Sequence, residues 1–243
     1  MSTIAPIVMV GVVVMSACSN EQNSNSYSAT LRIAAASSLG DVLPPMLEAF
    51  SNEFSTGYEV SYGGSGELAA QVRHGAPFDL VFFASFDSVS RLAADGLLQS
   101  EVVTGPRNSL VLVRHPDSVL DIDSRLGIGG LGVPAGDYAR KWISTSLDAY
   151  RAYELVEFPH VRSVLAAVEN RTCAAGFVYS TDIVGRIDLV VVAADQPTTT
   201  ASDYGLGVLA TSSQAAAAAQ LAEWLMQQES TWRHAGFTMP VSE

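Results

Sequence analysis

The segment EVSYGGSGELAAQVRHGAPFDLVFFA, residues 59–84, decides the fold class of this chain. Its residue pattern predicts a strand over Glu59–Tyr62, a helix over Glu67–His74 that ends at Gly75, and a second strand over Leu80–Ala84. Strands that alternate with helices in this way form the units from which parallel sheets are built. The segment therefore indicates an α/β fold.

The same alternation continues on both sides of this segment. Further strands are predicted at Leu31–Ala35, Ser109–Val113, Ala175–Tyr179, Asp188–Val192 and Tyr204–Leu209. Further helices are predicted at Leu43–Phe54, Ser88–Ala94, Tyr138–Ser146, Val161–Glu169 and Ser213–Gln228. This order is typical of a doubly wound sheet, in which ligands bind beyond the carboxyl ends of the strands. Residues 31–105 and 109–192 each hold one β/α set, so two lobes are possible, but periodicity by itself does not establish them.

The composition limits the kinds of partner that the protein can have. The 243 residues are 48% hydrophobic, which is enough for a substantial core, and the net charge is -12. Because there is no run of Lys or Arg, no nucleic-acid partner is expected. The acidic balance repels anions at long range, but salt screens that repulsion beyond roughly 8 Å. An anionic ligand would have to be held by local dipoles.

The N-terminal residues predict export and lipid anchoring. Ile7–Val14 is an apolar stretch of signal-peptide length, too short to span a bilayer, and the small residues before Cys18 look like a bacterial lipobox. We therefore expect a lipoprotein signal peptide over residues 1–18, lipidation of Cys18, and a flexible tether over residues 19–28. The alternative is a non-cleaved anchor or a buried strand, since Met15 stands where Leu is usual.

Five short, almost uncharged fragments offer hydroxyl and backbone N–H donors where a helix begins or a strand ends. They are residues 36–38, 63–66, 133–136, 160–162 and 178–180. The first turn of a helix leaves N–H groups without partners and carries about half a positive charge, so a small anion can bind there without a cationic side chain. Together the fragments predict a site for a fully deprotonated oxyanion.

Each fragment also has an ordinary structural interpretation. Ser38 could be an N-cap, with Asp41 at a spacing close to a capping box, and Tyr179 could be a core residue with a solvated hydroxyl. A serine hydrolase that uses Ser65 or Ser38 is a remote alternative. The G-x-S-x-G pattern of that class would need glycine where this chain has Glu67, and the four histidines form no catalytic pattern.

The stretch Gly127–Gly132 matches the letters of a dinucleotide-binding G-x-G-x-x-G motif. We do not interpret it as that motif, because the residues before it look like a polar loop and Val133-Pro134 interrupts before any helix. We interpret it instead as a flexible approach to Pro134-Ala135-Gly136, where Pro134 near the first helical position would leave the N–H of Ala135 free. The scattered histidines and cysteines predict no metal site, and Cys173, in an apolar stretch, is expected to be a core residue.

The ordered set of motifs resembles the extracytoplasmic molybdate-binding proteins of ABC importers. The resemblance covers about residues 31–240. It is carried by AAASSLGDVL at 34–43, GGSGELAAQVRHGAPFDLVF at 63–82, VPAGDYA at 133–139, VRSVLAAVENRTCAAGFVYSTD at 161–182 and HAGFTMP at 234–240. It implies the type II periplasmic-binding-protein fold, whose two α/β lobes, each a mainly parallel sheet flanked by helices, close around a tetrahedral molybdate or tungstate dianion. The implied boundaries are residues 29–106 with 204–243 for lobe 1 and residues 107–203 for lobe 2.

The resemblance also implies a ligand set and a set of partners. Its ligand groups fall on the hydroxyls and N–H groups of Ser38 and Ser65, the N–H groups of Ala135 and Val161, and the hydroxyl of Tyr179, with Ser37 as a neighbour of Ser38. No cofactor, catalytic residue or direct protein–metal ligand is implied. The expected protein is a monomeric, lipid-anchored binding protein outside the cytoplasm that serves permease subunits and is not an enzyme. The nearest alternative ligand is sulfate or another tetrahedral oxyanion.

One departure from the family pattern falls beside this ligand set. His160 stands where Asp or Asn is common, so the acidic cap of the helix that begins at Val161 is lost.

Overall fold

The computed structural model describes residues 30–121, 123–146, 148–194 and 202–240. The predicted signal peptide, Cys18 and the tether over residues 19–28 lie outside these ranges. Within them, no helix is both long enough and apolar enough to cross a bilayer.

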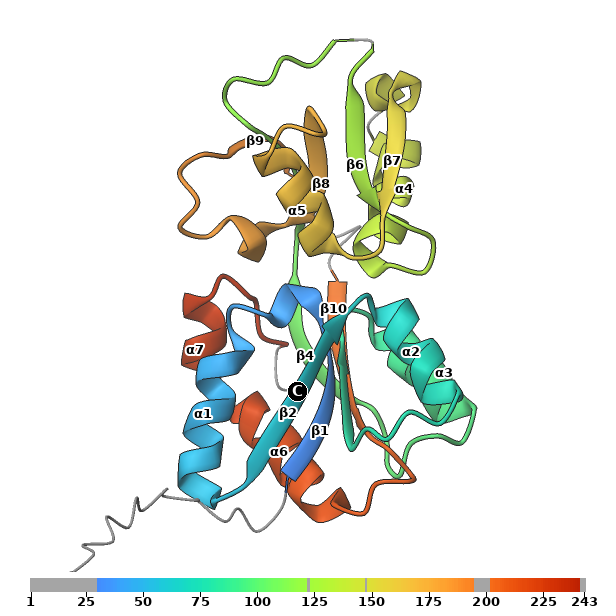
Figure 1. Cartoon of the computed structure of the whole chain (residues 1–243), viewed down its shortest axis with the longest axis vertical. Helices are drawn as coiled ribbons and strands as arrows, with labels where there is room; N and C mark the ends of the chain where they lie inside the picture. The colour runs from blue at the N-terminus through green and yellow to red at the C-terminus, as the bar shows by residue number, and fades with distance from the viewer. Residues whose placement is uncertain (1–29, 122, 147, 195–201, 241–243) are drawn as a thin grey trace, which may run out of the picture.

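Two α/β lobes follow one another along the long axis of the molecule (Figure 1). The first sheet has the order β2-β1-β3-β10-β4, with bounds Gly57–Gly63, Thr30–Ala36, Leu80–Phe83, Ser202–Val208 and Val103–Asn108. The second has the order β7-β6-β8-β5-β9, with bounds Glu154–Phe158, Arg125–Gly129, Ala175–Tyr179, Leu110–Arg114 and Val190–Ala194. In each sheet four strands run in one direction and a fifth, β10 or β5, runs against them. The predicted α/β fold with mainly parallel sheets is confirmed.

Helices cover both faces of each sheet. The α-helices are α1 Leu43–Phe54, α2 Ser65–Arg73, α3 Phe86–Ala94, α4 Pro134–Ser146, α5 Val161–Glu169, α6 Ala215–Gln227 and α7 Glu229–His234. Short 3-10 turns are η1 Ser37–Leu39, η2 Asp148–Ala152 and η3 Ser180–Ile183. In the first lobe, α2 and α3 lie on one side of the sheet and α1, α6 and α7 on the other (Figure 1).

The apolar run of β3 shows why this sheet needs a helix layer on each face. Successive strand residues point to opposite faces. Leu80 and Phe82 accordingly pack into the core under α1 and α6, whereas Val81 and Phe83 pack into the second core against α2 and α3. All four side chains are completely buried, as expected for a strand in the middle of a parallel sheet.

The chain passes between the two sheets twice. The first passage is short, because β4 of the first sheet ends at Asn108 and β5 of the second begins at Leu110. The return runs from Ala194 to Ser202, through residues outside the described ranges.

The interpretation of Gly127–Gly132 as a flexible approach is wrong. Residues Arg125–Gly129 form β6, which pairs with β7 and β8 inside the second sheet. The expectation that Pro134 lies near the first position of a helix is confirmed, because α4 begins at Pro134. The glycines let this helix lie against the strand, since a Cβ at Gly136 would come within 2.0 Å of the carbonyl oxygen of Gly129. The strands β4 and β7 and the helix α7 were also not predicted.

Candidate functional site

A cavity between the two lobes brings together every residue predicted to contact the ligand. We call it the interlobe cavity; its empty volume is about 210 Å³, including open space at its mouth. Its walls contain Ser37, Ser38, Ser65, Ala135, Val161 and Tyr179, together with Ala36, Gly63, Gly64, Ala84, Val133, Pro134 and His160. Of these described lining residues, none is Lys, Arg, Asp or Glu. The side chains that can donate a hydrogen bond are therefore mainly hydroxyls.

The sheet register accounts for the meeting of the two serine segments. Strands β1 and β2 are parallel neighbours, and Ala36 lies opposite Gly63 at their carboxyl ends. The turn η1 follows β1 and the helix α2 follows β2, so Ser38 and Ser65 both lie just beyond the same edge of the sheet. From the second sheet, Tyr179 ends β8 at the edge that faces them.

Three helix N-termini meet at the interlobe cavity: α2 at Ser65, α4 at Pro134 and α5 at Val161. The N–H groups of Ser65, Ala135 and Val161 belong to first turns, where no carbonyl of the same helix can accept them. In the part of the chain that the structure describes, no backbone carbonyl accepts a hydrogen bond from these three N–H groups. The cavity therefore combines unpaired donors with the positive ends of helix dipoles, as an anion site requires.

The Ser65 hydroxyl is already oriented by the backbone. The N–H of Ala84 donates to Ser65 Oγ over 3.2 Å, and the serine is 1% exposed. Because that oxygen accepts from a backbone N–H, its own proton stays free to donate into the cavity.

Ser38 and Tyr179 each contact a residue of β10. Ser38 Oγ lies 2.7 Å from the hydroxyl of Tyr204, so its predicted role as an N-cap with Asp41 is not realised. Tyr179 donates its hydroxyl to Ser202 Oγ over 3.3 Å, which is long for an O–H···O bond. Burial raises the pKa of Tyr179 well above its ordinary value, so its hydroxyl keeps its proton. To donate to a ligand, the Tyr179 hydroxyl must give up its hydrogen bond to Ser202.

His160 caps α5 in place of the expected acid. Its Nδ1 accepts the N–H of Ser163 over 3.2 Å and also contacts the Ser163 hydroxyl. The acidic cap is absent, as the sequence predicts, and an imidazole caps the helix in its place. In the described contacts this ring reaches Ser163 and neither Ser38 nor Ser65, so it is not placed as a base for either serine.

His160→Ala should lower the melting temperature of the protein, because the N–H of Ser163 loses its acceptor. Loss of an N-cap costs about 1 kcal/mol, which is roughly 2–4 °C for a chain of this size. His160→Asn should restore most of that loss in a calorimetric scan, because Asn is among the preferred caps. An Asn variant as unstable as the Ala variant would show that the imidazole does not act as a cap.

An ion-pair network lies next to the interlobe cavity. Arg162 Nε lies 3.1 Å from Asp182 Oδ1 within the second lobe, and its Nη2 lies 2.7 Å from Asp41 Oδ2 of the first lobe. The Asp182 side chain is 0% exposed, and desolvation raises its pKa to about 6 in spite of Arg162 and the N–H of Tyr179. The arginine therefore has its charge balanced by two carboxylates, and one of these contacts joins the lobes.

The lobes also touch through backbone atoms at the edge of the cavity. A Cβ at Gly64 would lie 2.5 Å from the carbonyl oxygen of Pro159, and one at Gly66 would lie 2.5 Å from that of Gly132. Both contacts join the first lobe to the second. Glycine is required at these two positions for the lobes to approach this closely.

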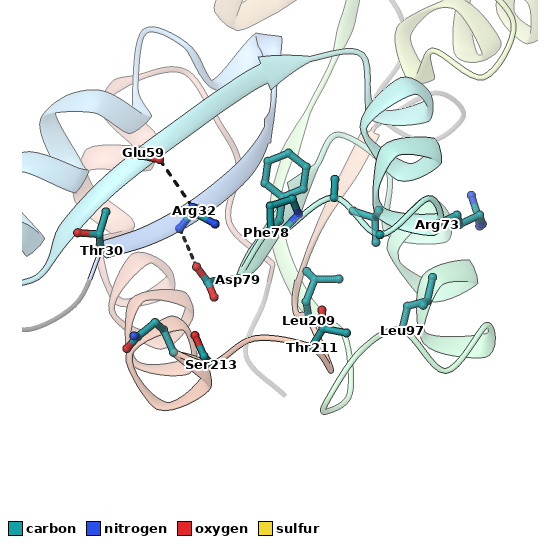
Figure 2. A pocket seen from close by; sticks show the side chains of 15 residues that line it. Thr30, Arg32, Glu59, Arg73, Phe78, Asp79, Leu97, Leu209, Thr211 and Ser213 are labelled. Carbon is teal, nitrogen blue, oxygen red and sulfur yellow. Dashed lines mark hydrogen bonds and ion pairs between the residues drawn. The ribbon is translucent and has the colours of Figure 1, made fainter.

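A larger groove, with an empty volume of about 1470 Å³ that includes open solvent, lies at the opposite end of the first sheet (Figure 2). Thr30, at the start of β1, lines it, whereas Ala36, at the end of β1, lines the interlobe cavity. Arg32 lies at its centre: the backbone N–H of Arg32 donates to Asp79 Oδ2 over 2.9 Å, and its guanidinium lies 3.8 Å from the carboxylate of Glu59. None of the predicted ligand residues lines this groove, and its two arginines, Arg32 and Arg73, are already paired with the carboxylates of Glu59 and Asp95.

Two lobes with donors that converge in a cavity between them are typical of a protein that binds a small ligand. Residues 31–238 match the family of bacterial extracellular solute-binding proteins. The chain belongs to that family.

Individual relatives extend the comparison over most of the chain. The protein is 30% identical over 239 residues to YvgL of Bacillus subtilis, provisionally named an ABC transporter substrate-binding lipoprotein, covering 91% of this chain and 92% of that one. It is 33% identical over 179 residues to the molybdate-binding protein ModA of Haemophilus influenzae, covering 65% and 69%. Among solved structures, the periplasmic molybdate-binding protein of Azotobacter vinelandii superposes with a TM-score of 0.77 at 19% identity, covering 87% and 100%.

Proposed function

We propose that the protein acts outside the cytoplasm, where it captures molybdate or tungstate in the interlobe cavity and delivers it to the permease of an ABC importer. The observation that carries the proposal is the convergence of hydroxyl and N–H donors from both lobes in one cavity whose described walls hold no carboxylate. Two of the three relatives described above, from Haemophilus influenzae and Azotobacter vinelandii, are named as molybdate-binding proteins. The lipid anchor on Cys18 and the monomeric state belong to the same proposal.

The chemistry of the cavity favours an oxyanion without protons. A molybdate dianion presents only acceptors, which the serine hydroxyls and helix N–H groups can satisfy. A protonated phosphate carries a donor of its own and would leave it unpaired against these walls, at a cost comparable to a buried unsatisfied group. Sulfate has no proton but shorter bonds, so some donors would lie beyond its reach.

The contacts of the two serines support a binding role over hydrolysis. A serine nucleophile needs a base that accepts its proton. Ser65 receives a hydrogen bond from the backbone of Ala84, and the cavity histidine, His160, is held by Ser163.

A thermal-shift series with molybdate, tungstate, sulfate and phosphate tests the proposal. Ligand at about 1,000 times its dissociation constant adds about 4 kcal/mol to the free energy of unfolding. For a chain of this size that is a shift of roughly 10 °C, and we expect it with molybdate and tungstate, a smaller shift with sulfate, and the smallest with phosphate. A series with no shift, or with the largest shift for phosphate, would overturn the proposal.

The matched variants are Ser65→Ala, which removes a cavity donor, and Ser51→Ala, which removes a buried serine hydroxyl inside α1. Each variant is compared with and without ligand, so that any change in the empty protein cancels. Only Ser65→Ala should reduce the rise in melting temperature that molybdate causes.

A further inference from the structure

The carboxamide of Asn108 is held in one orientation at the point where the chain leaves the first sheet. Its Oδ1 accepts the backbone N–H of Ser109 over 3.0 Å and the hydroxyl of Ser180 over 3.2 Å. A backbone N–H can only donate, so the oxygen of the amide must face Ser109. The NH₂ group therefore faces Tyr204, with Nδ2 3.3 Å from its hydroxyl, and Thr181, with Nδ2 2.8 Å from Oγ1.

This orientation determines the direction of the next two hydrogen bonds. Because the Tyr204 oxygen accepts from Asn108, the tyrosine proton is available to Ser38 Oγ, 2.7 Å away. Tyr204 is 0% exposed, and burial raises its pKa strongly, so the proton is retained. Ser38 Oγ accepts this hydrogen bond from the Tyr204 hydroxyl, so the proton of Ser38 itself is left to point into the interlobe cavity that this residue lines.

We propose that Asn108 and Tyr204 are positioning and specificity residues for the oxyanion site, because they fix the Ser38 hydroxyl as a donor and thereby select anions that carry no proton. We call Asn108, Tyr204 and Ser38 the donor relay. This inference rests on the proposed function and adds to it the origin of ligand selectivity. Ser65 is fixed in the same sense by the N–H of Ala84, so both serines present protons to the ligand.

Asn108→Asp should reverse the relay. A carboxylate at this position still accepts from Ser109 and Ser180 and now also accepts from Thr181 and Tyr204, and these donors stabilise its charged form. The Tyr204 proton then points at residue 108, the Ser38 proton points at Tyr204, and Ser38 turns a lone pair toward the cavity. A lone pair there suits an anion that carries a proton.

The test compares sulfate with phosphate at about pH 8, by calorimetric titration of the full chain. Both are then mainly dianions, but only phosphate carries a proton, so the added carboxylate repels both equally and cancels in the ratio of their affinities. We expect Asn108→Asp to shift that ratio toward phosphate by about tenfold or more, the cost of one misdirected hydrogen bond to a charged group. The double variant Asn108→Asp/Tyr204→Phe keeps the charge but breaks the relay, and it should lose the shift.

Tyr204→Phe gives a second, independent measurement. Without the tyrosine proton the Ser38 hydroxyl is free to rotate, so molybdate affinity should fall about tenfold. The further loss of molybdate affinity caused by Ser38→Ala should then be smaller in Tyr204→Phe than in the wild type. Tyr58→Phe, a tyrosine on β2 that does not line the cavity, is the matched control and should change neither quantity.

The outcomes separate the two proposals. Wild-type protein that binds none of the four oxyanions overturns the proposed function. Wild-type protein that binds molybdate, with an unchanged phosphate-to-sulfate ratio in Asn108→Asp, overturns the relay alone. If Asn108→Asp does not fold, additive effects of Ser38→Ala and Tyr204→Phe overturn it as well.

Discussion

Gly66→Ala should remove most of the ligand affinity while leaving the empty protein as stable as before or more stable. The new Cβ would lie 2.5 Å from the carbonyl oxygen of Gly132 on the other lobe, and a backbone oxygen cannot turn aside as a side chain can. The lobes would then be held apart, and a ligand on Ser38 and Ser65 would lose the donors of the second lobe. Loss of two hydrogen bonds to a charged ligand corresponds to at least about 100-fold in affinity.

The effect on folding should have the opposite sign. Gly66 lies in the first turn of α2, and replacing glycine by alanine in a helix favours folding by about 0.5–1 kcal/mol. Calorimetric titration with molybdate and a melting curve without it measure the two effects separately. Gly64→Ala, which meets Pro159 in the same way, should repeat the loss of affinity.

Gly130→Ala is the matched control, since it lies two residues from Gly132 and its nearest neighbour would be an ordinary 3.5 Å away. It should bind as the wild type does. Equal affinities of Gly66→Ala and wild type would mean that ligand binding does not need the lobes in this close arrangement.

Most strands that the sequence predicted have strongly apolar residues, whereas two of the strands that it missed, β4 and β6, contain glycine, proline or charged residues. The run Leu80–Phe83 is buried on both faces and stands out in the sequence. By contrast, β4 contains Gly105, Pro106 and Arg107, and β6 alternates glycine with apolar residues. Their strand structure comes from pairing with β10, β7 and β8 rather than from local propensity.

The residues that donate to the ligand could be predicted from the sequence, whereas the residues that orient them could not. Ser38, Ser65, Ala135 and Val161 lie at the starts of helical turns, where a local signal exists, and they were predicted. Tyr204 is 166 residues from Ser38, and Asn108 is 96 from Tyr204. No local pattern connects such residues, so the groups that orient the predicted donors become visible only once the sheet order is known.

Arg162→Met should destabilise the protein strongly at neutral pH. It leaves the carboxylate of Asp182, which is 0% exposed, without its cation. Breaking a buried pair by removing one partner costs about 3–5 kcal/mol, whereas removing an exposed partner costs under about 1 kcal/mol. Asp41→Asn, which removes the partner that is 67% exposed, is therefore the matched control and should leave the melting temperature nearly unchanged.

The pH dependence identifies the cause of that loss. The pKa of Asp182 is raised from 3.8 to about 6 in the folded protein, so the folded state binds this proton more tightly, and stability from this group falls as pH rises between those values. Removing Arg162 takes away an influence that lowers the pKa, so the pKa should rise further and the decline should extend to higher pH. Arg162→Met should thus be close to wild type at about pH 4.5 and well below it at about pH 8, with a difference in melting temperature of roughly 10 °C.

A second variant separates the buried charge from the loss of arginine packing. Arg162→Met/Asp182→Asn removes the charge together with its partner, and the amide still offers an oxygen to the N–H of Tyr179, which donates to Asp182 over 3.0 Å. Replacing both members of a buried pair is often close to neutral, so the double variant should recover most of the stability and lose the pH dependence. A deficit that is the same at both pH values and survives in the double variant would instead assign the effect to packing of the arginine side chain against its neighbours.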